Sequence, residues 1–211
     1  MTPDERQALE QRIHAAHDAG HRQDAATLLL EGYGREILGF LIARVRDREA
    51  AHEIFSRFSE DLWSGLPGFR WQCSARVWSY TLARHAASHY GREAQRRRGR
   101  QVPLSHAGPI SQVADRVRTA TLQSAGTEAR NRIVRLRERL PADDQTLLIL
   151  RINRQLTWTE IAQVMFHEGE TVSPEVLERE AIRLRKRYQS AKDKLRKLAL
   201  AEGVLKATDE G

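Results

Sequence analysis

Apolar residues recur at helical spacing through most of this 211-residue chain. In the first half, the spacing predicts a helix over about residues 3–19 and a second helix with an apolar face from Leu28 to Val45. A third is expected over about residues 48–63, and a fourth from near Ala75. No segment has the period-two alternation of a β-strand, so the pattern predicts an all-α protein.

A segment rich in turn-forming residues separates two helical halves. Residues 99–127 combine Pro, Gly and Ser with few large apolar side chains, which predicts a flexible linker with a short helix near 113–121. We therefore expect two small helical domains, at residues 1–98 and 128–211.

The second half has the layout of a helix-turn-helix module. A helix starting at Leu140-Pro141 precedes a capping box at Thr157–Glu160 and a short helix over 158–165. A long helix starting at Pro174 then carries an apolar seam in steps of four and three. The pattern leaves open whether this helix runs straight or breaks near Glu180, so that a new N-terminus enters a DNA groove.

The charge favours a nucleic-acid partner. Lys and Arg number 35 against 28 acids, for a net charge of +7. Within 183–197 of the last helix, Asp193 is the single acid. Arginine and glutamine can bind base edges and lysine can bind phosphates, although charged helix faces are often merely solvated. The candidate DNA-contacting residues of this face are Arg183, Arg185, Lys186, Arg187, Gln189, Ser190 and Lys192.

Aromatic and basic residues also gather around the fourth helix. Trp78, Tyr80 and the histidines of this helix precede an arginine-rich run, a combination that suits single-stranded nucleic acid. The preceding loop, residues 65–74, carries Phe69 and Trp71. These rings can either form an exposed binding surface or fold under the loop and pin it to the core, and the sequence leaves both open.

The sequence lacks the motifs that several kinds of chemistry require. A single cysteine, Cys73, excludes an internal disulfide framework, and the absence of a signal peptide or long apolar run favours a cytoplasmic protein without membrane insertion. His85 and His89 have a metal-ligand spacing, but no further ligand lies nearby except Cys73. Phosphate loops and nucleophile elbows are missing, so we expect no metal, no cofactor and no enzymatic activity.

These motifs together resemble a known family. Residues 51–63 resemble a stretch of Ala-Glu-Asp, two apolar residues, Gln and a later Trp, and residues 77–85 resemble Trp-Leu, two variable residues and Ile-Ala-Arg-Asn. In the second half, residues 140–162 resemble a Leu-Pro helix followed by a Glu-Ile-Ala helix, and residues 184–195 a recognition helix. In this order the motifs resemble the extracytoplasmic-function group of bacterial sigma factors.

The resemblance implies roles for particular residues. The helix over 48–63 would dock on the polymerase clamp through Glu49, His52, Glu53, Ser56, Arg57 and Glu60. The melted minus-ten strand would contact Phe69, Arg70, Trp71, Gln72, Ser74, Arg76, Arg84, His85, His89, Arg92, Arg96 and Arg97. The last helix would bind the duplex minus-thirty-five element. The sequence departs from the family at His52, Glu53 and Ser56, where Glu, Asp and Gln are usual, and at His85, where Asn is common.

The main hypothesis is therefore a sigma factor that directs core RNA polymerase to promoter DNA and helps to melt it. The alternatives are a stand-alone helix-turn-helix regulator and a degenerate sigma-like protein that binds polymerase without supporting initiation. A nuclease would need a metal cluster that the sequence does not offer. An anti-sigma factor is a common partner in the family, but nothing in the sequence locates its binding site.

Overall fold

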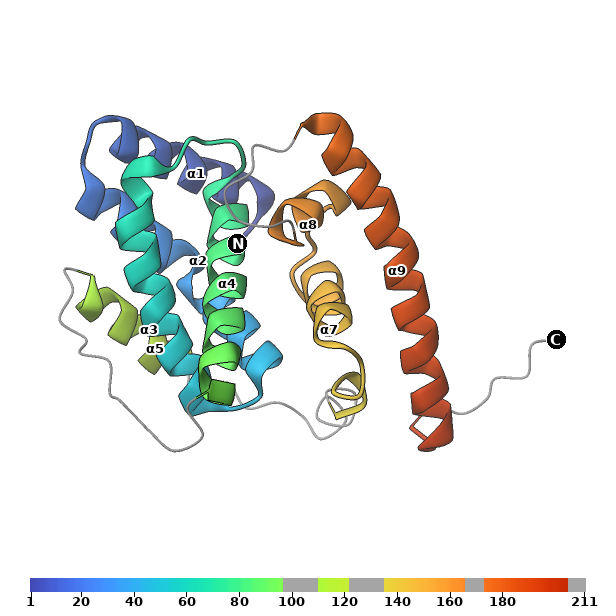
Figure 1. Ribbon diagram of the computed structural model, residues 1–211. Coiled ribbons are helices and arrows are strands. Elements are labelled where there is room, and N and C mark those ends of the chain that lie inside the picture. Colours follow the sequence, from blue (N-terminus) through green and yellow to red (C-terminus); the bar gives the residue numbers. More distant parts are fainter. Residues whose placement is uncertain (97–109, 122–134, 166–172, 205–211) are drawn as a thin grey trace. The chain divides into compact units, whose positions relative to one another are not determined.

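The computed structural model describes residues 1–96, 110–121, 135–165 and 173–204. All regular structure in these ranges is helical, which confirms the all-α class (Figure 1). None of the helices in these ranges is both long and apolar enough to cross a membrane. The chain forms two compact units, Met1–Gln123 and Ser124–Gly211.

Helix α2 is the centre of the first unit. The helices are α1 (Pro3–Asp18), α2 (Arg22–Val45), α3 (Arg48–Gly65), α4 (Ala75–Arg96) and α5 (Ser111–Thr121), with a short 3-10 turn, η1 (Leu66–Gly68), after α3. Helix α2 packs against each of the other four α-helices. The largest side chains of the core are fully buried aromatic rings, at Tyr33, Phe40, Phe55, Phe58 and Tyr80.

Local capping fixes where these helices begin. Thr2 and Glu5 form a reciprocal capping box on α1. Arg46 adopts a left-handed conformation (φ 67°) that ends α2, and the Asp47 side chain then accepts a hydrogen bond from the Ala50 amide to start α3.

A side chain from another helix caps α4. The Glu10 carboxylate of α1 accepts hydrogen bonds from the amides of Ala75 (2.8 Å) and Arg76 (3.0 Å). A carboxylate at a helix N-terminus satisfies amides that have no partner within the helix and is favoured by the helix dipole. Glu10 therefore ties α1 to the start of α4.

Helix α5 belongs to the first compact unit. The helix expected near 113–121 is present, but it packs on α2 and α3, so the first unit extends past residue 98 to Gln123. Gly34 makes this packing possible, because a Cβ atom there would lie 3.0 Å from a methyl group of Val117. Sequence composition alone had placed these residues in the linker.

The second unit has the predicted order of helices. Helix α7 (Ala142–Leu148) continues into a π-helical turn, η2 (Ile149–Asn153), followed by α8 (Trp158–Met165) and α9 (Pro174–Ala201). The Thr157–Glu160 capping box is confirmed by hydrogen bonds in both directions, of 2.7 and 3.3 Å.

Helix α9 is continuous over 28 residues, which settles the alternative left open at Glu180. Its predicted apolar seam packs as expected, with Leu184 and Ala191 buried. Leu140 and Leu148 complete this small core.

Candidate nucleic-acid interface

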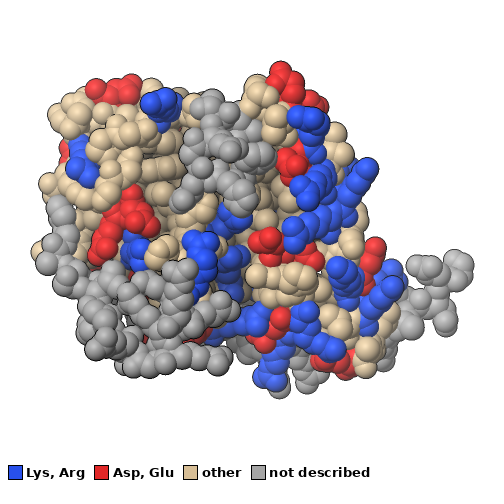
Figure 2. All heavy atoms as spheres, in the orientation of Figure 1, with Lys and Arg blue, Asp and Glu red and all other residues tan. Residues whose placement is uncertain are grey.

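The outer face of α9 is exposed and basic. Figure 2 shows Lys and Arg side chains gathered along this helix. The exposed residues of the predicted face are Arg183, Arg185, Lys186, Gln189, Ser190 and Lys192. Arg183 approaches Glu180 at 3.4 Å, and the ammonium of Lys192 lies 5.7 Å from the Tyr188 ring centroid. Arg183 and Lys192 are themselves exposed and contact residues of the same helix, so their positive charge stays at the surface.

Arg187, a member of the predicted DNA-contacting set, pairs with carboxylates of α7. Its Nε donates to Oδ1 of Asp144 at 2.5 Å, and its Nη1 lies 3.8 Å from Asp143. The Asp144 side chain is 6% exposed, and Lys194 approaches it at 3.9 Å. A buried carboxylate is stabilised by such cations, so Arg187 connects α9 to α7.

The first two turns of α9 are acidic. Glu175, Glu178 and Glu180 precede Arg183, and a hydrogen bond with the Ser173 side chain lowers the pKa of Glu175. Three carboxylates in these turns, against one cation at Arg179, disfavour contact with phosphates there. The basic face lies farther along the helix, from Arg183 onward.

The rings of the loop before α4 are packed against the unit. Phe69 is buried and stacks on Trp78 with ring centroids 4.5 Å apart. Trp71 is half-buried, and its Nε1 donates to Nδ1 of His17 at 3.2 Å. Phe69 is thus a core residue, and the alternative in which the rings pin the loop to the core is the one that the structure adopts. Arg70, between the two rings, and Gln72, directly after them, are exposed.

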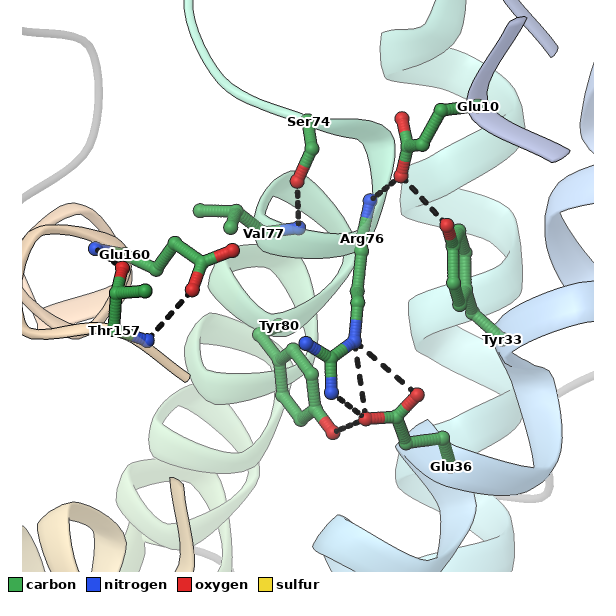
Figure 3. A network of polar contacts seen from close by, with 9 residues as sticks. All are labelled: Glu10, Tyr33, Glu36, Ser74, Arg76, Val77, Tyr80, Thr157 and Glu160. Atoms are coloured by element: carbon green, nitrogen blue, oxygen red, sulfur yellow. Dashed lines mark hydrogen bonds and ion pairs between the residues drawn. The ribbon is translucent and has the colours of Figure 1, made fainter. Parts of the chain in front are cut away.

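Arg76 and Ser74, both expected at the DNA strand, form hydrogen bonds within the first unit (Figure 3). Arg76 is 3% exposed, and its guanidinium pairs with the Glu36 carboxylate, which also accepts a 2.7 Å hydrogen bond from the Tyr80 hydroxyl. The Ser74 hydroxyl accepts a hydrogen bond from the Val77 amide at 3.2 Å and so caps α4. Burial and fixed partners remove the Arg76 guanidinium from the candidate interface.

Farther along α4, a polar face remains accessible. His85, His89, Arg92 and Arg96 recur in steps of four, three and four, which places them on one side of a helix. His89 and Arg92 are exposed, while His85 and the adjacent Arg84 are half-buried. The side chain of Arg96 and the whole of Arg97 lie outside what the structure describes.

The predicted polymerase-contacting residues of α3 differ in exposure. Glu49 and Glu60 are exposed, and His52, Glu53 and Arg57 are half-buried. Ser56 is buried, donates to the His52 carbonyl at 3.1 Å, and accepts a hydrogen bond from Arg118 of α5. Ser56 is therefore covered where α5 packs on α3.

Sequence reasoning missed Arg118, because its segment was assigned to the linker. The available signal was the spacing of Val113, Ala114 and Val117, which form the buried face of α5.

Comparison with known proteins supports a relationship to sigma factors. The chain is 26% identical over 152 residues to RNA polymerase sigma factor YlaC of Bacillus subtilis (strain 168), a match that covers 69% of this chain and 81% of that protein. No family model matches the sequence. No solved structure matches it either.

Proposed function

We propose that this chain is a sigma factor of the extracytoplasmic-function group, which binds core RNA polymerase in the cytoplasm and directs it to promoters without catalytic activity of its own. The observation that carries the proposal is the helix-turn-helix unit with an exposed basic face on α9, in a chain related to sigma factors. The finer roles below are parts of this proposal.

The second unit binds duplex DNA at the minus-thirty-five element. Because the N-terminal turns of α9 are acidic, the middle of the helix faces the groove, with Arg185, Lys186 and Gln189 as the main contacts. Lysine and arginine contacts to phosphates release counterions, so affinity falls steeply as salt rises.

The first unit binds the melted minus-ten strand and the polymerase. The exposed Arg70 of the loop and the His89–Arg92 face of α4 are available to bases and phosphates of a single strand. Helix α3 docks on polymerase, with Glu49 and Glu60 as its accessible acidic residues.

The test is transcription in vitro with core RNA polymerase and a pool of genomic promoters, with and without the purified chain. New discrete start sites are expected, together with their loss in a Lys186→Glu variant, which reverses one charge on the exposed face of α9. A Lys206→Glu variant supplies the matched control, because it makes the same charge change beyond the end of α9.

Other outcomes point to the alternatives. Polymerase binding without transcripts would indicate a degenerate sigma-like protein. Tight DNA binding by the isolated chain, without polymerase binding, would indicate a stand-alone regulator with symmetric half-sites.

A further inference from the structure

We propose that α5 and RNA polymerase compete for one surface of α3, so that α5 must leave this surface before the chain can bind polymerase. The inference rests on the proposed function, because it assumes that α3 is the polymerase-docking helix. It goes beyond that function by adding a device within the chain that limits docking.

The surface of α2 and α3 on which α5 packs, here called the seat of α5, includes predicted docking residues. Arg118 of α5 donates a hydrogen bond to the Ser56 hydroxyl, and its charge also acts on His52 one turn earlier. Both α3 residues belong to the set expected to meet polymerase. With α5 in place, Ser56 is 6% exposed, so its hydroxyl is covered at the surface that polymerase would meet.

The apolar contact that seats α5 is small. Its buried residues are Ile110, Val113, Ala114 and Val117, and the helix has 11 residues. A helix of that length is marginally stable without packing, so leaving the seat is compatible with losing the helix. Gly34 of α2 provides the close approach for Val117.

A polar group where α5 meets α3 lacks a hydrogen-bond partner in the described part of the chain. Nε2 of His52 is buried without a hydrogen-bond partner among the described residues. Burial also lowers the pKa of the Arg118 guanidinium, because the charged form loses water there. Buried polar groups without full partners weaken a contact, which suits a surface that is covered reversibly and not permanently.

The experiment measures binding of core RNA polymerase to the full chain and to a Val117→Asp variant, which places a carboxylate in the apolar seat. Gln112→Asp is the matched control, because it adds the same charge to the exposed side of the same helix. A double variant, Val113→Ser with Val117→Ser, removes the apolar contact without adding a charge. Hydrogen exchange of the α5 amides in the isolated proteins reports whether the helix has left its seat.

Undocking is expected to tighten polymerase binding by about tenfold or more in both seat variants, because a binding-competent state that was a minor population becomes the main one. Gln112→Asp, whose carboxylate the N-terminal end of the α5 dipole favours, should bind no more tightly than the unmodified chain. In the unmodified chain, addition of polymerase should increase exchange of the α5 amides.

Three results would overturn the proposal. One is unchanged or weaker polymerase binding when the α5 amides exchange freely, and another is continued protection of α5 in the polymerase complex. In both cases the unmodified chain still binds polymerase, so the proposed function stands. Absence of polymerase binding by every variant, including those with α5 undocked, would remove the proposed function and this inference with it.

Discussion

Arg70 and Arg76 lie six residues apart and meet different surroundings. The Arg70 side chain is exposed on the loop, whereas the Arg76 side chain is 4% exposed and faces Glu36, whose side chain is 22% exposed. A guanidinium removed from water is stable only with a fixed anionic partner, and the partner depends on it in turn. Surroundings and not residue type therefore decide which arginine can meet a ligand.

Substitution of these two arginines should separate stability from binding. Arg76→Ala should lower the free energy of unfolding of the first unit by roughly 2–4 kcal/mol, because Glu36 loses its guanidinium partner. Arg70→Ala should change it by less than about 0.5 kcal/mol while weakening promoter binding of the polymerase complex. Urea unfolding and a DNA-binding assay measure the two effects, and equal stability of the two variants would contradict the assignment.

His52 should make the stability of the first unit depend on pH. Burial, followed by the charges of Arg118 and Arg48, lowers the pKa of His52 below its ordinary value of 6.5. As the pH falls below 6.5, the unfolded chain binds this proton before the folded one, so the contribution is complete above that pH and is lost in acid. A His52→Gln variant should lose less stability than the unmodified chain between about pH 7.5 and about pH 5.5. Equal losses in urea unfolding would contradict this.

At the scale of the element, α9 combines two tasks on one helix. Its seam packs on the second unit, and its outer face carries the charge. Lys186 and Arg187 are adjacent in sequence, yet the 100° turn per residue directs them differently: Lys186 is exposed and Arg187 pairs with Asp144.

Alanine substitutions of Lys186 and Arg187 should therefore have different effects on stability and DNA binding. Lys186→Ala should leave stability nearly unchanged and reduce the slope of log affinity against log salt by about one unit. Arg187→Ala should lower the free energy of unfolding by about 1–3 kcal/mol, since Asp144 loses its closest cation. Salt titrations of DNA binding and urea unfolding of both variants provide the test. A stable Arg187→Ala variant with the larger loss of DNA affinity would show that Arg187 contacts DNA after all.

At the scale of the whole molecule, each unit buries its own core. Phe40 belongs to the aromatic core of the first unit, and Leu148 to the aliphatic core of the second. Units with separate cores can fold and unfold separately. This organisation suits a protein that would bind two separated promoter elements, one with each unit.

Core truncations should consequently act within one unit. Phe40→Ala should destabilise the first unit by about 3–5 kcal/mol and Leu148→Ala the second by about 2–5 kcal/mol. Hydrogen exchange resolved along the chain should show lost amide protection in the substituted unit alone. Loss of protection in both units after either substitution would contradict independent folding.

The sequence by itself determined the features that depend on near neighbours along the chain. Apolar spacing identified the main helices, the Thr157–Glu160 motif located the start of α8, and the order of motifs indicated a helix-turn-helix unit. These features follow from sequence because helical periodicity and capping involve residues within about four positions of each other.

Only the tertiary structure decided which candidate side chains remain accessible. Arg76 is buried because α2 brings Glu36, 40 residues earlier, against it, and Ser56 is covered because Arg118, 62 residues later, returns on α5. The seat of α5 also required the close approach at Gly34. Such contacts depend on how helices pack, and periodicity along one helix does not specify which partner covers a given position.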